Sequence, residues 1–286
     1  MKRIISLICV FVIMFLLTGC TSDSMENITI YTSVYPVEFV TERLYKGHAK
    51  VYSMYPRGIS PYTYKLTNKQ ITDYGESDLV IYNGLSDEKD YIVKMLNNNK
   101  NLKIIDSTNN IEYTYSLDEI WMNPSNVLMI AQNIREGLKE YVNSTLLSEE
   151  IDANYEELKI NISSIDADLK EMVENASDKT IVVQNDEFTF LNKYGLNVVS
   201  LDEKTITDKV YSDTVKLIGE GNIKNIYIIK GQKENESVKK IMKEYPDLNI
   251  VELDPINNIS TEDKNNDVNY ITIMNENIDK LKQELY

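Results

Sequence analysis

The feature that most constrains the fold is a long amphipathic segment near the middle of the chain. Between Ser148 and Asn175 the apolar residues recur at steps of three and four, which is the helical period. They are Ile151, Tyr155, Leu158, Ile162, Ile165, Leu169 and Met172. Such a helix has roughly seven or eight turns and is about 40 Å long at 1.5 Å per residue. We therefore expect residues 148–176 to form a backbone helix that links two domains, because a simple crossover needs less length.

Short β-branched runs alternate with amphipathic stretches on both sides of this helix, and residues 256–269 read as a loop. The expected strands are 28–35, 50–55, 78–83, 103–106, 179–184, 197–201, 226–230 and 249–253. The expected helices are 37–45, 67–76, 88–97, 124–141, 188–194, 207–220, 237–245 and 270–285. Strand–helix alternation predicts parallel sheets. The predicted fold class is α/β, with two parallel-sheet lobes at residues 28–147 and 177–286 and a ligand cleft between them.

The first twenty residues have the pattern of an export signal. Two positive residues precede the apolar run 4–17, which is too short to span a bilayer comfortably. The run ends in Leu-Thr-Gly-Cys at 17–20, the pattern that a lipoprotein signal peptidase reads. We expect residues 1–19 to be removed, Cys20 to carry the lipid and residues 20–27 to form a tether. The alternative is an ordinary signal peptide with a chance cysteine. In both cases we expect the protein to be exported from the cytoplasm. If Cys20 carries the lipid, we expect the protein to be anchored on the extracytoplasmic face of the bacterial cell membrane.

Charge and cysteine content limit the chemistry. The formal net charge of −15 becomes −17 when the two positive residues of the leader are removed. Such a chain repels nucleic acid and anionic lipid. The only other cysteine, Cys9, lies in the leader, so the mature chain has no thiol for a disulfide, catalysis or a soft metal. Any site must be built from oxygen and nitrogen.

Five segments lie at or next to the ends of the predicted strands or at helix starts, and α/β proteins bind ligands beyond the carboxyl ends of their strands. They are Pro-x-Gly-x-x-Pro-Tyr-x-Tyr-x-Leu-Thr at 56–67, the strand and turn Asp-Leu-Val-Ile-Tyr-Asn-Gly-Leu at 78–85, Glu-Ile-Trp-Met-Asn-Pro at 119–124, Val-Gln-Asn-Asp-Glu-Phe at 183–188 and Leu-Asp-Pro at 253–255. In this order they resemble the zinc- and manganese-binding solute-binding lipoproteins of ABC importers, over nearly the whole mature chain. The resemblance implies two α/β lobes on a long helix, a metal ion between them, and delivery to an ABC permease and its ATPase by a monomer.

The resemblance also implies a ligand set, and here the sequence departs from the family. The family supplies His, His, His or Glu, and Asp, where this chain has Tyr62, Glu119, Asn185 and Asp254. An oxygen-only set suits Mn²⁺, Mg²⁺, Ca²⁺ or Fe³⁺ better than Zn²⁺, so the identity of the metal stays open. The neighbouring carboxylates of Asp118, Asp186 and Glu187 are candidate supplements. The single histidine, His48, matches a surface position at a strand start, and the family's His-rich loop is absent.

Other functions stay open at this level. An amine or amino acid could use Glu119 and Asp254 against its ammonium group, with Asn185 and Tyr62 as hydrogen-bond partners. Alternatively, the chain is a surface lipoprotein, an adhesin or accessory protein, that kept the fold and lost the metal. An enzyme is disfavoured, because the sequence has no Gly-x-Ser-x-Gly, His-Glu-x-x-His or Gly-rich phosphate loop. The twenty tyrosines do not by themselves define a sugar-binding surface.

Overall fold

The computed structural model describes residues 25–286. The predicted leader 1–19, the lipid-anchored Cys20 and most of the tether lie outside the described residues. Within them, no helix combines the length and the apolar character needed to cross a bilayer.

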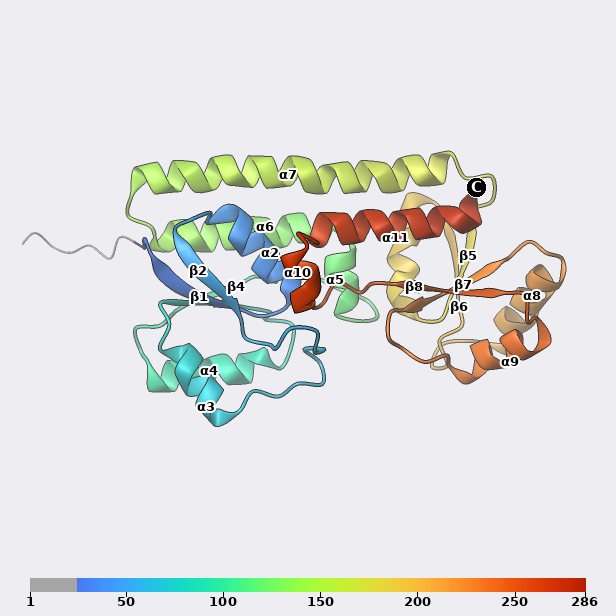
Figure 1. The fold of residues 1–286 in the computed structure, drawn as a ribbon, viewed down its shortest axis with the longest axis horizontal. Helices are drawn as coiled ribbons and strands as arrows, with labels where there is room; N and C mark the ends of the chain where they lie inside the picture. Colours follow the sequence, from blue (N-terminus) through green and yellow to red (C-terminus); the bar gives the residue numbers. More distant parts are fainter. Residues whose placement is uncertain (1–24) are drawn as a thin grey trace, which may run out of the picture.

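The chain builds two four-stranded parallel sheets with the same strand order (Figure 1). The first sheet has the order β2-β1-β3-β4 and the second the order β6-β5-β7-β8. Their strands are β1 (Ile28–Thr32), β2 (Ala49–Ser53), β3 (Leu79–Tyr82), β4 (Lys103–Asp106), β5 (Thr180–Val183), β6 (Asn197–Ser200), β7 (Asn225–Ile229) and β8 (Asn249–Leu253). The predicted α/β class with two parallel-sheet lobes is confirmed.

Helices flank both sheets. The first lobe has α2 (Tyr35–Leu44), α3 (Asn68–Gly75), α4 (Glu88–Asn98), α5 (Asp118–Met122) and α6 (Pro124–Tyr141). The second has the 3₁₀ helix η1 (Asp186–Tyr194), α8 (Asp208–Gly219), α9 (Glu236–Glu244) and α11 (Tyr270–Leu285). The short helix α10 (Thr261–Asn265) lies beside α2 of the first lobe, where its Lys264 pairs with Glu42 at 2.8 Å (Figure 1). The expectation of a plain loop over 256–269 was wrong, because the short helix α10 forms inside it. The Ser260 side chain caps α10 by accepting a hydrogen bond from the Asp263 amide.

Local sequence signals fix several helix ends. Thr67 and Gln70 form a capping box at the start of α3. The Asn123 side chain caps α6, with Pro124 at its first position. η1 ends at Gly195, whose φ of +99° lies in the left-handed region that favours glycine.

The long backbone helix is α7 (Thr145–Glu174), and it runs along both lobes (Figure 1). Its buried face contributes to one hydrophobic core that spans the molecule. The same core contains Ile30 and Leu79 of the first sheet and Val183 and Tyr227 of the second. Two smaller clusters lie one in each lobe. Because the lobes share one packed core, a large movement between them must disturb close-packed side chains.

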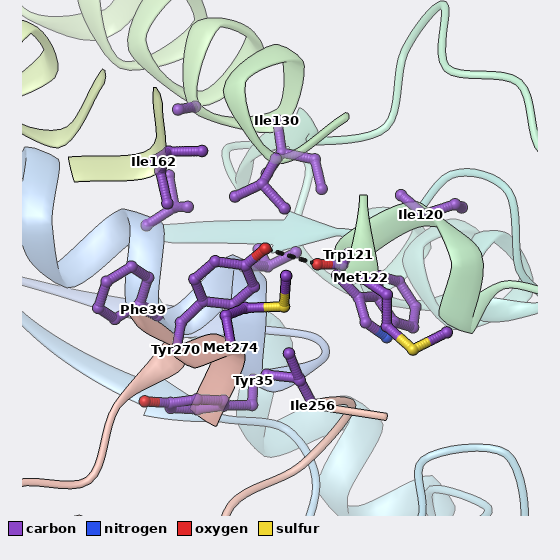
Figure 2. Packing of buried hydrophobic residues seen from close by; sticks show 14 of the residues in the cluster. Tyr35, Phe39, Ile120, Trp121, Met122, Ile130, Ile162, Ile256, Tyr270 and Met274 are labelled. Atoms are coloured by element: carbon purple, nitrogen blue, oxygen red, sulfur yellow. Dashed lines mark hydrogen bonds between the residues drawn. The ribbon is translucent and has the colours of Figure 1, made fainter. Parts of the chain in front are cut away.

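Part of this shared core lies beneath α5 (Figure 2). Trp121 is fully buried, and its carbonyl oxygen accepts a 2.7 Å hydrogen bond from the Tyr270 hydroxyl of α11. The Tyr270 ring stacks on Phe39 of α2, with ring centroids 5.6 Å apart. Two elements far apart in sequence, α11 and behind it α2, thus hold α5 in place, and α5 begins with two carboxylates.

Candidate functional site

Asp118, the first residue of α5, lies at the meeting point of the two lobes. Its Oδ1 accepts hydrogen bonds from the Tyr62 hydroxyl at 2.6 Å, from Trp121 Nε1 at 3.2 Å and from Asn257 Nδ2 at 3.0 Å. Burial raises the pKa of Asp118, these hydrogen bonds act against that rise, and the nearby charge of Asp254 adds to it. Asp118 is therefore a buried carboxylate held in place by donors from both halves of the chain.

Tyr62 contributes a neutral oxygen to this centre. Burial raises the pKa of its phenol well above 10, and the adjacent Asp118 charge adds to the effect. Although 45% of the residue's surface is exposed, its hydroxyl lies against buried Asp118, so desolvation of that end is the effect that matters. The hydroxyl keeps its proton at neutral pH and donates a hydrogen bond to Asp118.

The second lobe supplies two acceptors from the start of η1. The Oδ1 of Asn185 and the Oε2 of Glu187 are buried, and neither has a hydrogen-bond partner in the described part of the chain. Burial raises the pKa of Glu187, and the Asp118 charge is among the groups that raise it further. Glu187 is thus within electrostatic range of Asp118. Asp186 is engaged elsewhere, because its Oδ2 accepts from the Thr205 hydroxyl at 2.7 Å.

Asp254 follows β8 and is already paired with a cation of the protein. Its Oδ2 lies 2.9 Å from Lys230 Nζ, and its Oδ1 accepts from the Ile256 amide at 2.8 Å. Asn277 of α11 holds the backbone of Asp254 through two hydrogen bonds of 2.9 Å. The side chain is 19% exposed, so its partner Lys230 competes with any incoming cation.

Glu119 serves a different purpose from its neighbour. Its Oε2 accepts from the backbone amides of Thr114 and Tyr115, both at 3.1 Å, and so closes the loop that leads into α5. The structure therefore brings Asp118 to the centre and turns Glu119 to the loop. His48 also lies away from the centre and contacts Glu150 at 3.0 Å. Over residues 25–286, no three His, Cys, Asp or Glu side chains gather as a metal-binding cluster.

Comparison with known proteins identifies relatives along nearly the whole chain. The family described as "Zinc-uptake complex component A periplasmic" (ZnuA) matches residues 30–284. The zinc-binding lipoprotein AdcA of Streptococcus pneumoniae is 22% identical over 310 residues, covering 99% of this chain and 61% of AdcA. The iron-binding protein YfeA of Yersinia pestis is 26% identical over 192 residues, covering 63% of this chain and 61% of YfeA. The chain thus spans about three fifths of the length of these relatives.

Solved structures show the same fold. The Zn(II)-bound ZnuA-like domain of Streptococcus pneumoniae AdcA has a TM-score of 0.71 and 22% identity, over 91% of this chain and 99% of the domain. The metal-dependent lipoprotein YcdH of Bacillus subtilis has a TM-score of 0.74 and 20% identity, over 91% of this chain and 99% of YcdH. Together with the family match, these likenesses confirm the type of solute-binding protein that the five segments indicated. The chain belongs to the ZnuA family of periplasmic zinc-uptake components.

Proposed function

We propose that this protein is the extracytoplasmic solute-binding component of an ABC importer, and that it captures a metal ion with oxygen atoms between its lobes. One observation carries the proposal: Asn185 and Glu187 each present a buried oxygen without a described partner, and Glu187 lies within electrostatic range of the Asp118 carboxylate. A buried acceptor left unsatisfied costs about 1–3 kcal/mol. A cation between these groups satisfies the acceptors and neutralises the carboxylates at once.

The donor set selects the class of ion. Asp118, Glu187 and Asn185 supply oxygen only, with the Tyr62 hydroxyl and Asp254 beside them. Relatives are named for zinc, iron and manganese, so the family handles several first-row metals. Without imidazole or thiolate ligands, Mn²⁺ and other hard cations fit better than Zn²⁺. We therefore expect Mn²⁺ to bind, and the preference for Zn²⁺ over Mn²⁺ to be smaller than at a site built from imidazole ligands.

The location and the partners of this function follow from the leader and the family. The Leu-Thr-Gly-Cys pattern at 17–20 supports a lipid anchor on Cys20, which keeps the protein at the extracytoplasmic membrane surface. There it delivers the ion to a membrane permease coupled to an ATPase. We also propose that the backbone helix at residues 148–176 is the boundary between the two lobes, because both lobes pack along it.

The proposal is tested by titrating metals into the full chain after a chelator has removed any bound metal. Mn²⁺, Fe³⁺, Zn²⁺, Ca²⁺ and Mg²⁺ are compared by calorimetry and thermal unfolding. A metal at a hundred times its Kd raises the free energy of unfolding by about 2.7 kcal/mol. If no metal raises it, the metal proposal fails, and the protein is a family member that has lost this ligand.

Two near-isosteric variants decide which carboxylate binds. Asp118→Asn keeps an oxygen for the three donors but removes the charge, so we expect Mn²⁺ affinity to fall at least about tenfold, or 1.4 kcal/mol. Glu119→Gln keeps an oxygen for the two loop amides, so we expect little change. The opposite ranking would show that the loop rearranges and that Glu119 is the ligand, as the resemblance of segment 119–124 to the family implies.

A further inference from the structure

A cavity of about 340 Å³ opens in the first lobe next to the candidate metal site. Its volume lies in the range of small-molecule pockets. Five tyrosines line it: Tyr55, Tyr62, Tyr64, Tyr91 and Tyr113. They come from the segment after β2, from α4 and from the loop before α5. Tyr62 also donates to Asp118, so the cavity and the candidate metal site share one residue.

The aromatic walls are held in place by their own contacts. The rings of Tyr55 and Tyr64 meet at 89° with centroids 6.2 Å apart, so the two rings stand perpendicular to each other. The Tyr64 hydroxyl is fixed by Gln70 Nε2 at 2.9 Å, and the same amide contacts the Tyr74 hydroxyl at 3.2 Å. A pocket that is formed before its ligand arrives loses less entropy on binding.

A buried carboxylate, Glu88, also lines this cavity. Only 4% of Glu88 is exposed. Its Oε1 accepts from the Tyr55 hydroxyl at 2.9 Å and its Oε2 from the Asn83 amide at 2.8 Å. These two donors leave acceptor capacity, because an ionised carboxylate offers about four lone-pair sites. Among the ion pairs of residues 25–286, none pairs Glu88 with a cationic side chain, and burial raises its pKa to about 7.

The other charged side chains of the cavity do not offset Glu88. Lys65 and Asp87 both line it, both are exposed, and their opposite charges cancel at the rim. The lining of the interior is therefore dominated by tyrosine side chains and one carboxylate. Aromatic faces attract cations through the ring quadrupole, an interaction worth about 0.5–2 kcal/mol.

We propose that this tyrosine-lined pocket binds a small organic cation, an amine or a quaternary ammonium compound, with its charge towards Glu88 and its carbon groups against the tyrosine rings. The pocket goes beyond the proposed metal function and does not rest on it. The two ligands differ in chemistry: the metal needs converging oxygen atoms, whereas the organic cation needs ring faces and one counter-charge.

Calorimetry on the full chain, with chelator present to exclude metals, tests the pocket with choline as the probe. The neutral carbon isostere 3,3-dimethylbutan-1-ol has the same shape without the charge. We expect choline to bind and the isostere to bind about tenfold more weakly. Equal binding of the two would overturn the proposal, as would the absence of choline binding at tens of millimolar or tighter binding of a neutral sugar such as glucose.

Two neighbouring tyrosines provide a matched pair of variants. Tyr113 and Tyr115 are 41% and 51% exposed, but only Tyr113 lines the cavity. We expect Tyr113→Leu to weaken choline binding about threefold to tenfold and Tyr115→Leu to leave it unchanged. Glu88→Gln should weaken it about tenfold. Equal effects of the two tyrosine substitutions would contradict the assignment. Titrating Mn²⁺ into the same variants separates the two sites, since neither Glu88→Gln nor Tyr113→Leu should change metal affinity.

Discussion

The two lobes have the same strand order but bring different polar groups to the space between them. On the first-lobe side, three donors saturate one oxygen of Asp118. On the second-lobe side, Asn185 and Glu187 hold buried oxygens with no described partner, and Asp254 is covered by Lys230. One oxygen of Asp118 is thus satisfied by donors of the protein itself, whereas the buried oxygens of Asn185 and Glu187 have neither a donor nor a cation in the described residues.

In the proposed metal site, the ligand chemistry differs from that of the family while the architecture stays the same. The shared core holds α5, and with it Asp118, in one position. The residues at the start of η1 sit on a short 3₁₀ helix, which has poorer hydrogen-bond geometry than an α-helix. We therefore interpret Asp118 as the fixed reference of the site and η1 as the part that adapts to the ion.

The largest expected effect is on stability and comes from replacing Trp121, the buried side chain that holds α5 in the shared core. Trp121→Ala deletes a fully buried ring from the shared core, and we expect the free energy of unfolding to fall by about 3–5 kcal/mol. It also removes the indole donor to Asp118. Urea unfolding measures the loss. Trp121→Phe keeps much of the buried volume and should cost clearly less. Similar, small losses for both would show that the shared core does not hold α5.

The second prediction concerns Glu88, whose burial raises its pKa from 4.5 to about 7. The folded state keeps the proton at a higher pH than the unfolded state, so stability falls as pH rises from about 4.5 to about 7. Glu88→Gln mimics the protonated form and removes this slope. We expect the variant to match the wild type near pH 4 and to exceed it by up to about 3 kcal/mol at pH 8. Urea unfolding at both pH values checks the result.

A control variant separates this effect from general charge repulsion. Asp87→Asn removes one negative charge at the exposed neighbouring position. It should leave the pH slope unchanged, because an exposed carboxylate is well solvated in both states. If Asp87→Asn flattens the slope as much as Glu88→Gln does, the net charge of the acidic chain is responsible and Glu88 is not specially desolvated.

The fold could be predicted from the sequence because its signals are local. The boundaries of β4, β8 and α11 follow from β-branched runs and helical periodicity, and they match the structure. The orientation of Asp118 and Glu119 could not be predicted in this way. Which of two consecutive carboxylates faces the centre depends on the loop before α5, where two amides take the Glu119 oxygen. The sequence motif at 119–124 predicts where α5 lies, but the conformation of the loop before α5 determines which of the two carboxylates points to the centre.

The tyrosine-lined pocket shows the same limit. Tyr55, Tyr62 and Tyr64 are close in sequence, so a cluster near the first lobe was visible in the sequence. Tyr91 and Tyr113 join it only through the packing of α4 and of the loop before α5. Contacts between segments far apart in the chain carry no periodic signal, and this is why the pocket emerges only from the structure.

A smaller effect is expected where the segment after β8 is fastened to the first lobe. Asn258 donates to the carbonyls of Pro56 and Ile59 and accepts from the Gly58 amide, at 3.1, 2.6 and 2.9 Å. Asn258→Ala removes all three bonds, and because this contact is exposed we expect a loss of only about 1 kcal/mol. Urea unfolding measures it. Asn266→Ala, in the same segment at the end of α10, is the control and should cost less.

The smallest effect tests whether the second half of the site is restrained by its own lysine. Lys230→Met frees the Asp254 carboxylate, so we expect Mn²⁺ affinity to rise about twofold to fivefold, as suits a partly exposed ion pair. Removing any lysine makes the net charge more negative and so favours cation binding in general. The control is therefore Lys233→Met, at an exposed lysine three residues further on. A greater rise for Lys230→Met places Asp254 among the ligands. Equal rises would leave only long-range attraction and would remove Asp254 from the proposed set.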